Sequence, residues 1–411
     1  MRSMAVQRRT ITTLMVSSAM GYFGFLSVAA VVGLLSAEIL GSDTFAGIPA
    51  AAGTLGTALA ATSLALRSAH RGRRPALTLG YGIGTAGALF ALIAGQQRWF
   101  WALVVAMALF GVAQASNLQS RFAAADLAEE DRTARSISLV VWVGTIGAVL
   151  GPPAALWANG WGLDFGLANW VGPTLLGLAG MMLAAIVVGT RLRPDPLVEA
   201  GGVDPDAPYQ SPTAGAMHSL QVIWPNPKAR LAVIAMGVSQ MAMVAVMTMT
   251  PLHMRDHGHA EMSTLVISLH VLGMFGLSPL IGGWADRYGR IRVLGLGAIT
   301  LGTGTVTAVV AGYVPGLVFA GLFLLGLGWS FALIAGSALL TESLALEERV
   351  GAQGFADVVM SLLGATAAFS SGFVKSTVGY HWLANLATVS AVLVLFITWS
   401  VARRATAAVR G

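Results

Sequence analysis

Long apolar runs separated by short charged turns form the main pattern along this chain. Each run is close to the roughly 20 apolar residues that cross the hydrocarbon core of a bilayer as one helix. The pattern therefore predicts twelve membrane-spanning helices, at residues 11–35, 44–66, 76–95, 100–123, 136–157, 170–190, 229–252, 262–284, 292–314, 316–341, 352–374 and 381–402.

Composition agrees with this interpretation. Of the 411 residues, 56% are hydrophobic and only 10% are charged, so the chain lacks the polar surface that a soluble protein of this length needs. The absence of cysteine excludes disulfides and thiolate metal sites. The net charge of +6 does not come from a basic patch interleaved with aromatic residues, so nucleic acid is not an expected partner. The expected surroundings are a lipid bilayer.

The positions of the lysines and arginines predict the orientation. With both termini in the cytoplasm, all but three of the 24 basic side chains fall on the cytoplasmic side of the predicted helices. Cytoplasmic loops of membrane proteins carry an excess of Lys and Arg. We therefore predict a multi-pass protein of the cytoplasmic membrane, meaning the inner or plasma membrane, with both termini cytoplasmic.

One long polar segment divides the apolar runs into two sets. Between Arg191 and Arg230 it carries seven of the 15 prolines and shows no apolar periodicity, which is typical of a flexible linker. The predicted organisation is an N-terminal six-helix half at 1–190, a cytoplasmic linker at 191–228 and a C-terminal six-helix half at 229–411.

The two halves repeat at an offset of 217 residues, the difference between positions 289 and 72. This offset aligns Gly72 with Gly289 and Arg73 with Arg290, and it pairs further glycines in the following helices. Repeats of this kind, with a substrate site near the midplane, occur in many secondary transporters. The predicted fold class is an all-α membrane protein with twelve transmembrane helices in two six-helix pseudo-symmetric halves.

A short charged loop joins two of the apolar runs in the second half. Its spacing is G-x-x-x-D-R-x-G-R, and it includes Asp286, Arg287, Gly289 and Arg290. The loop resembles the signature of the major facilitator superfamily, in which it joins the second and third helices of a six-helix half. The resemblance implies transport by alternating access, with these four residues gating the cytoplasmic side. Simple anchoring of the loop by its cations is the alternative interpretation.

The first half carries an altered version of this loop. Ala69 stands where the second half has Asp286, and His70 replaces the arginine after it. In the family, the loop acid is held by the positive N-terminus of a helix in the opposite half. We therefore expect Asp286 to contact the start of the fifth span near Arg135 and Ser136. Ala69 is expected to make no such contact with the eleventh span.

Polar residues share one face of the fourth span. Gln114, Asn117 and Arg121 follow one another at helical spacing, so this face must turn away from lipid. We expect Gln114 and Asn117 to line a substrate cavity. Arg121 lies at the cytoplasmic end, where gating and an interfacial position are equally good interpretations.

The fifth span carries small residues followed by a proline. Gly147, Gly151 and Pro152 resemble the antiporter motif of superfamily exporters, although the pair of glycines expected after the proline is absent. The resemblance implies a gating role. Close helix packing explains the same residues equally well.

Methionine and histidine cluster in the seventh and eighth spans. Met243 and Met247 share a helical face with Gln240, and His270 and Met274 lie one turn apart on the next span. Thioether and imidazole groups are ligands that suit Cu(I). The patterns M-x-x-x-M-T-x-T-P and S-x-H-V-L-x-M-F resemble the copper-importing branch of the superfamily that supplies cytochrome oxidase assembly. The resemblance implies that Met243, Met247, His270 and Met274 handle a metal ion. Together with Gln240, these residues are also candidates for binding another substrate.

Two further interpretations of this cluster stay open. Methionine also fills gaps in apolar interiors, so Met243 and Met247 fit a packing role. An ionisable group in mid-membrane is a functional candidate by default, and an imidazole titrates near neutral pH, so His270 is a candidate proton carrier. The acids Asp126, Asp286, Glu342 and Asp357 lie toward the cytoplasmic ends of the predicted spans.

Motifs for other chemistry are out of context or missing. The stretch from Gly82 to Gly87 satisfies G-x-G-x-x-G, but it lies inside a span with no strand before it, so dinucleotide binding is not expected. Neither Lys228 nor Lys375 follows a glycine, so no phosphate-binding loop can be built. No nucleophile, base and orienting group share a face. We expect no enzymatic activity and no cofactor.

The sequence therefore predicts a monomeric secondary transporter for a small molecule or a metal ion. Import of a soft metal such as copper is the leading specific hypothesis. Proton-coupled efflux of a small lipophilic or cationic compound is the first alternative, and a membrane sensor or assembly factor that does not transport is the second. The substrate, the direction of transport and the coupling ion stay open.

Overall fold

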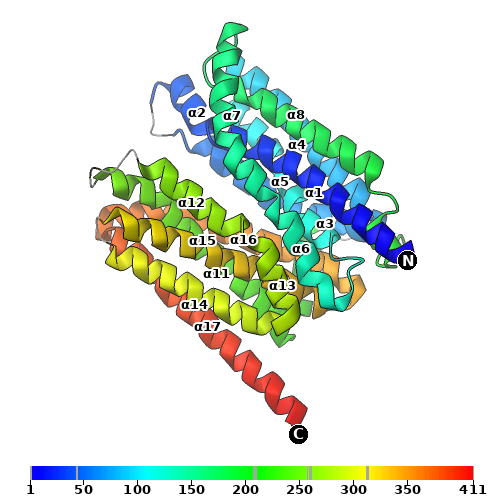
Figure 1. The fold of residues 1–411 in the computed structure, drawn as a ribbon. Coiled ribbons are helices and arrows are strands. Elements are labelled where there is room, and N and C mark those ends of the chain that lie inside the picture. The colour runs from blue at the N-terminus through cyan, green and yellow to red at the C-terminus, as the bar shows by residue number, and fades with distance from the viewer. Residues whose placement is uncertain are drawn as a thin grey trace. The chain divides into compact units, whose positions relative to one another are not determined.

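The computed structural model describes residues 2–42, 45–206, 211–256, 258, 262–311 and 314–410. Every regular element within these residues is a helix (Figure 1). In chain order the elements are α1 (Arg2–Ala29), α2 (Val32–Leu40), α3 (Ile48–Arg71), α4 (Arg73–Gln96), α5 (Phe100–Ala123), the 3-10 helix η1 (Glu130–Arg132), α6 (Thr133–Trp142), α7 (Gly144–Asp164), α8 (Pro173–Arg191), α9 (Pro196–Glu199), α10 (Pro212–Ile223), α11 (Pro227–Asp256), α12 (Ser263–Phe275), α13 (Ser278–Tyr288), α14 (Arg290–Val310), α15 (Pro315–Glu342), α16 (Leu346–Val378) and α17 (Tyr380–Arg410).

Membrane-length segments confirm the predicted all-α architecture. Among the described residues, 12 helical segments are long and apolar enough to cross a membrane. Three of these segments contain a break of one or two residues, which separates α1 from α2, α6 from α7 and α12 from α13. The twelve spans predicted from hydrophobic length are therefore present, and some of them are not single continuous helices.

The polar segment after α8 contains regular structure that its composition did not predict. It forms two short helices, α9 and α10. The carboxylate of Asp195 accepts hydrogen bonds from the amides of Leu197 at 3.0 Å and Val198 at 3.4 Å. Asp195 thereby caps the N-terminus of α9. These two stretches are helical rather than the flexible coil expected for residues 191–228.

The chain divides into two compact units. The first comprises Met1–Ala128, Val143–His218 and Leu346–Val358. The second comprises Glu129–Trp142, Ser219–Ala345 and Val359–Gly411. The first part of α16 therefore packs with helices of the N-terminal sequence half, and α6 packs with helices of the C-terminal half.

Small residues set the helix spacing in the first unit. A Cβ on Gly111 of α5 would stand 1.9 Å from the carbonyl oxygen of Gly53 in α3, and one on Gly56 would stand 2.0 Å from that of Ala108. These approaches are possible only without a side chain, so α3 and α5 touch backbone to backbone. Thr57 Oγ1 adds a hydrogen bond to the carbonyl oxygen of Gly111 at 2.8 Å.

The G-x-G-x-x-G stretch lies inside α4 and faces α5. A Cβ on Gly84 would stand 2.3 Å from the Cβ of Ala113, and one on Gly87 would stand 2.4 Å from the amide nitrogen of Phe110. These two glycines allow α4 and α5 to pack closely. The stretch lies inside a helix and has no strand before it, as the sequence predicts.

In the second unit, α15 packs against α11, α12, α13 and α14, and α14 also lies beside α17 (Figure 1). A Cβ on Gly328 of α15 would stand 2.5 Å from the amide nitrogen of Leu301 in α14. Gly328 is the residue that the 217-residue offset aligns with Gly111. Glycine at this repeat position allows a close helix approach in both units.

Candidate functional site

The two loops of the repeat share one backbone geometry. Gly72, at φ +90°, lies between α3 and α4, and Gly289, at φ +92°, lies between α13 and α14. L-amino acids with a side chain rarely adopt this region, so glycine is required at both turns. The next residue, Arg73 or Arg290, begins the following helix in each repeat.

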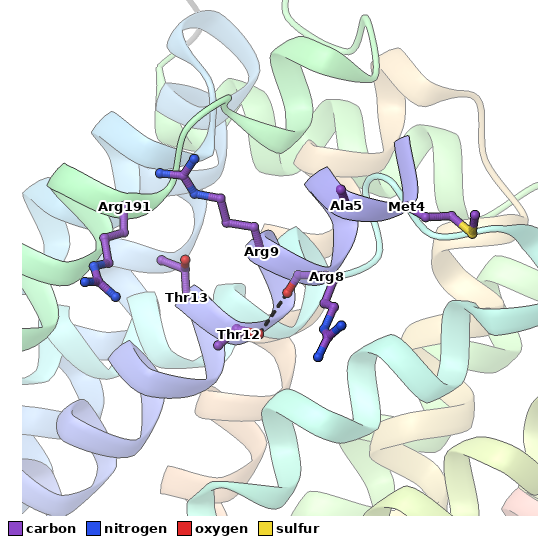
Figure 2. A pocket seen from close by; sticks show the side chains of 7 residues that line it. All are labelled: Met4, Ala5, Arg8, Arg9, Thr12, Thr13 and Arg191. Atoms are coloured by element: carbon purple, nitrogen blue, oxygen red, sulfur yellow. Dashed lines mark hydrogen bonds between the residues drawn. The ribbon is translucent and has the colours of Figure 1, made fainter. Parts of the chain in front are cut away.

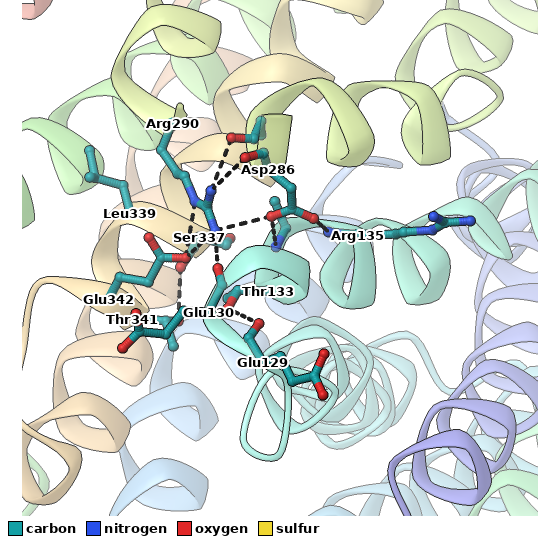
Figure 3. A network of polar contacts seen from close by, with 12 residues as sticks. Glu129, Glu130, Thr133, Arg135, Asp286, Arg290, Ser337, Leu339, Thr341 and Glu342 are labelled. Atoms are coloured by element: carbon teal, nitrogen blue, oxygen red, sulfur yellow. Dashed lines mark hydrogen bonds and ion pairs between the residues drawn. The ribbon is translucent and has the colours of Figure 1, made fainter. Parts of the chain in front are cut away.

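In the second loop, Asp286 caps helix α6 (Figure 3). Its carboxylate oxygens accept hydrogen bonds from the backbone amides of Ala134 at 3.0 Å and Arg135 at 2.9 Å. This is the contact with the start of the fifth span that the sequence predicts. The first turn of α6 has no acidic residue, so Asp286 supplies the negative charge that a helix N-terminus favours.

Arg290 connects the loop acid to the end of α15 (Figure 3). Its Nη2 lies 3.0 Å from Asp286 and donates a hydrogen bond to Glu342 at 2.6 Å, while Nε donates to the same oxygen at 3.0 Å. Nη2 also donates to the carbonyl oxygen of Glu130 at 2.6 Å. Arg287, the other arginine of the signature, is exposed.

The first loop buries its arginine against a different acid. Arg73 donates from Nε and Nη2 to the two carboxylate oxygens of Asp126, at 2.8 and 3.0 Å. Nη2 also donates to Oε1 of Gln353 in α16 at 2.7 Å. Burial raises the pKa of Asp126, and the positive charge of Arg73 opposes that rise. Asp126 stands one position away from the repeat equivalent of Glu342.

A carboxylate from the polar segment lies beside the first loop. Asp195 accepts hydrogen bonds from the backbone amides of Arg73 at 3.1 Å and Arg74 at 2.7 Å, in addition to capping α9. One side chain thus satisfies the free amides of two helix N-termini. The sequence assigned Asp195 no role, although an acidic N-cap followed by Pro196 is a recognisable helix start.

Ala69 lies in an apolar cluster. It packs against buried Leu197 of α9 and buried Val350 of α16. The start of α16 carries Glu347 and Glu348 in its own first turn. That helix N-terminus therefore carries negative charge of its own.

A buried ion pair joins α5 to α16. Nη2 of Arg121 lies 2.6 Å from Oδ1 of Asp357, and the two side chains are 2% and 0% exposed. Nη1 of Arg121 donates to the carbonyl oxygen of Leu118. Among the described residues, Oδ2 of Asp357 is buried and has no hydrogen-bond partner. The sequence singled out Arg121 but did not pair it with Asp357.

The other polar residues of α5 also lie in the interior of the first unit. Tyr81 Oη donates to Oδ1 of Asn117 at 2.8 Å, and Nδ2 of Asn117 donates to Oε1 of Gln114 at 2.9 Å. A Cβ on Gly21 of α1 would stand 2.3 Å from Oδ1 of Asn117. Asn117 is therefore enclosed by α1, α4 and α5, whereas Gln114 is half-buried, and the substrate-binding role of both stays a prediction.

Gly147, Gly151 and Pro152 lie in α7, beside α1. A Cβ on Gly147 would stand 2.6 Å from the backbone carbon of Tyr22, and one on Gly151 would stand 3.1 Å from the amide nitrogen of Ser27. Pro152 lies inside the helix. These contacts are those of close helix packing, and the gating role stays a prediction.

His270 and Met274 of α12 face α15. A Cβ on Gly326 would stand 3.1 Å from Nδ1 of His270 and 3.1 Å from Cγ of Met274. Nδ1 of His270 pairs with the carbonyl oxygen of Leu322 at 2.7 Å. The imidazole is fully buried, and within the described part of the chain its Nε2 has no hydrogen-bond partner.

The other members of this predicted cluster lie on α11. Gln240 accepts a hydrogen bond from the indole Nε1 of Trp329 at 2.6 Å. The polar partner of His270 lies on α15, not on α11, where Met243 and Met247 are. The arrangement gives no support to a copper site, and this ligand set stays a prediction.

A pocket of about 690 Å³ lies at the start of α1 and the end of α8 (Figure 2). Its basic side chains are Arg8, Arg9 and Arg191. Arg8 and Arg9 leave the helix in different directions, and Thr12 Oγ1 donates to the carbonyl oxygen of Arg8 in its own helix. The polar groups do not converge, so this pocket is a poor candidate for the substrate site.

Within the described residues, twelve apolar spans form two repeats, each with an arginine-bearing turn between its second and third spans, as in membrane transporters with internal repeats. The chain belongs to the Major Facilitator Superfamily, whose family model matches residues 14–267 and 231–410. The family predicted from the loop signature is therefore confirmed.

Similar proteins agree with this assignment. The chain is 34% identical over 409 residues to the uncharacterized MFS-type transporter YdeG of Bacillus subtilis, with 96% of this chain and 93% of YdeG covered. It is 29% identical over 386 residues to the riboflavin transporter RfnT of Brucella anthropi, with 92% of both chains covered. The structure of the human organic anion transporter MFSD10 has a TM-score of 0.79 at 13% identity, covering 95% of this chain and 99% of MFSD10. The likeness to MFSD10 concerns the fold alone.

Proposed function

We propose that this chain is a proton-coupled transporter of a small polar organic molecule, with Asp357 as the proton-binding group and Arg121 as its partner. The buried pair carries the proposal, because one oxygen of Asp357 has no partner among the described residues. A buried ion pair is weak evidence for stability, since desolvation offsets its attraction. Ionisable groups inside membrane helices more often mark ion or proton pathways.

The geometry gives Asp357 two states. When ionised, it holds the Arg121 guanidinium at 2.6 Å by a charge-assisted hydrogen bond. When Oδ2 takes a proton, the carboxyl becomes neutral, and the attraction that ties α5 to α16 weakens. The positive charge of Arg73 in α4 also interacts electrostatically with Asp357, so the carboxylate lies near two arginines.

Hydrogen-bonding groups within each unit, taken separately, support the substrate class. In the first unit, Tyr81, Asn117 and Gln114 form a chain of hydrogen bonds, and Gln114 at its end is half-buried. Gln240 places an amide beside the indole of Trp329 in the second unit. A few polar groups beside aromatic rings suit a planar molecule with hydrogen-bonding edges. Riboflavin, for which the relative RfnT is named, belongs to this class.

Copper import ranks below this proposal. A Cu(I) site needs thioether and imidazole groups that converge on one point. The polar partner of His270 lies on α15, whereas Met243 and Met247 lie on α11. His270 itself stays the alternative proton carrier, because its Nε2 is buried without a described partner.

We infer that the turns at Arg73 and Arg290 face the cytoplasm, because the basic residues gather on the side of these turns. Membership of the cytoplasmic membrane and a monomeric state are part of the same proposal. Asp286 and Arg290 then act at the cytoplasmic gate, where their hydrogen bonds to α6 and α15 hold the second unit's turn in place.

Riboflavin transport in proteoliposomes tests the proposal. The wild-type protein should exchange labelled riboflavin without a gradient and accumulate it when a proton gradient is imposed. The single variant Asp357→Asn removes the carboxylate that neutralises the buried Arg121, which costs several kcal/mol. The double variant Arg121→Gln/Asp357→Asn removes both charges, so it should fold, keep exchange and lose accumulation.

His270→Gln is the matched comparison, because it removes a buried titratable group from the second unit. If His270→Gln loses accumulation and the double variant keeps it, the proton passes through His270 and the proposed role of Asp357 is wrong. If the folded wild-type protein does not exchange riboflavin, the substrate class is wrong.

A further inference from the structure

A second pocket of the first unit has a long apolar wall. It measures about 910 Å³ and is lined by α3, α4 and α5, together with Pro205 of the polar segment and Pro212 at the start of α10. Leu59 of this wall is 76% exposed, so the wall belongs to the outer surface of the helix bundle. The large apolar side chains along it include Leu59, Leu66, Leu79, Ile83, Leu109 and Val112.

Basic side chains close one end of this groove. Arg67, His70 and Arg71 come from the last turns of α3, and no acidic side chain is among the lining residues. Nε of Arg67 is buried and has no hydrogen-bond partner in the described part of the chain. The groove is therefore complementary to a molecule with a negatively charged head and an apolar tail.

The length of the groove matches one leaflet of a bilayer. Leu59 and Arg71 are 12 positions apart on α3 (71 minus 59), which is roughly 18 Å at about 1.5 Å per residue. Half of a hydrocarbon core of about 30 Å is about 15 Å. A lipid whose phosphate lies at Arg71 thus reaches the midplane near Leu59.

We propose that this groove binds an anionic phospholipid, with the phosphate at Arg67 and Arg71 and an acyl chain along Leu59 and Leu109. The acyl chain lies over the junction of α3 and α5, where Gly56 meets the backbone of Ala108. The acyl chain of the bound lipid covers the contact between α3 and α5 and separates it from the other lipids of the bilayer. The pocket in Figure 2 has arginines but no such apolar wall, so it offers no surface for an acyl chain.

Native mass spectrometry of the purified full chain tests the proposal. Micelles are doped with phosphatidylglycerol or, at the same level, with zwitterionic phosphatidylcholine. The wild-type protein should retain phosphatidylglycerol about 25-fold better, since two arginines near a membrane surface each contribute about a factor of five. Arg67→Gln/Arg71→Gln should reduce this preference to near unity.

Two variants serve as controls. Arg8→Gln/Arg9→Gln removes the same charge from the pocket of Figure 2 and should keep the preference. Ser63→Trp fills the groove from an exposed position and should reduce the retention of phosphatidylglycerol with all arginines present. A phosphatidylglycerol with a diazirine on its acyl chain should crosslink to α3 and α5 of the wild-type protein.

Three results would overturn the proposal. Equal retention of the two lipids by the wild-type protein would show that the groove does not recognise the charge of the headgroup. An unchanged preference in Arg67→Gln/Arg71→Gln places that recognition elsewhere. Displacement of phosphatidylglycerol by inorganic phosphate at equal concentration means that the arginines bind a free anion and that the apolar wall takes no part.

Discussion

The turns at Gly72 and Gly289 have the same backbone and different partners. In the second repeat the acid lies in the loop itself, because Asp286 caps α6 and pairs with Arg290. In the first repeat, Asp126 forms the ion pair with Arg73. Asp195, which lies 122 positions after Arg73 in the sequence, caps α4. The two repeats thus retain the arginine-bearing turn, and the acids around it come from different segments.

Burial separates the two arginines further. The Arg73 side chain is 1% exposed, whereas that of Arg290 is 11% exposed and pairs with the partly exposed Glu342. A buried charge whose partner is removed costs far more than one that water can reach. The ion pair of the first loop therefore lies in the protein core, whereas the ion pairs of the second loop lie nearer the surface.

Removal of each arginine should give the largest difference between the loops. Arg73→Gln removes the salt-bridge partner of buried Asp126 and should lower the free energy of unfolding by about 3 to 5 kcal/mol. Arg290→Gln should lower it by about 1 kcal/mol. Unfolding by denaturant in one fixed micelle measures both losses. The double variant Arg73→Gln/Asp126→Asn should recover most of the first loss, and equal losses for the two single variants would contradict the comparison.

Removal of the two capping acids should give smaller, local effects. Asp195→Ala exposes the amides of Arg73 and Arg74, and Asp286→Ala exposes those of Ala134 and Arg135. A lost cap costs about 1 kcal/mol, so exchange of these amides should accelerate about fivefold. Hydrogen exchange resolved to single peptides measures this. Unchanged exchange at α4 in Asp195→Ala would mean that the linker carboxylate does not stabilise the first loop.

Loss of the loop charge alone should give the smallest effect. Asp286→Asn keeps a hydrogen-bonding side chain but removes an interaction of roughly 0.3 to 1 kcal/mol with the N-terminus of α6. The population in which α6 and α13 are in contact should fall about two- to fivefold. Spin labels on these two helices report the distance distribution. A distribution like that of the wild type, with transport intact, would mean that the loop only anchors the protein by its positive charges and has no gating role.

Sequence patterns predicted the spans and the second loop because both depend on local features. Hydrophobic length defines a span, and the signature around Asp286 lies within nine positions. The partner of Arg121 was beyond reach, because Asp357 lies 236 positions away and nothing local specifies which face of α16 meets α5. The contact of His270 with α15 also depends on how α12 is rotated about its axis. A span that is apolar on all sides does not indicate that rotation.

The short helix α9 shows a different kind of limit. Asp195 and Pro196 form a recognisable start, but a four-residue helix is not stable by its own hydrogen bonds. Its position depends on Leu197, which packs against Ala65 and Val350, and on the amides of α4 that Asp195 also binds. Proline content predicted a coil because composition carries no information on such contacts.

The proton-binding role of Asp357 is tested most directly by infrared difference spectroscopy of the reconstituted protein between mildly alkaline and mildly acidic buffer. A protonated carboxyl has a C=O band that a carboxylate lacks. We expect this band to appear at acidic pH in the wild-type protein and to be missing from the Arg121→Gln/Asp357→Asn variant. If the variant shows the same band, or the wild type shows none, Asp357 is a permanently ionised structural partner of Arg121 and does not carry the proton.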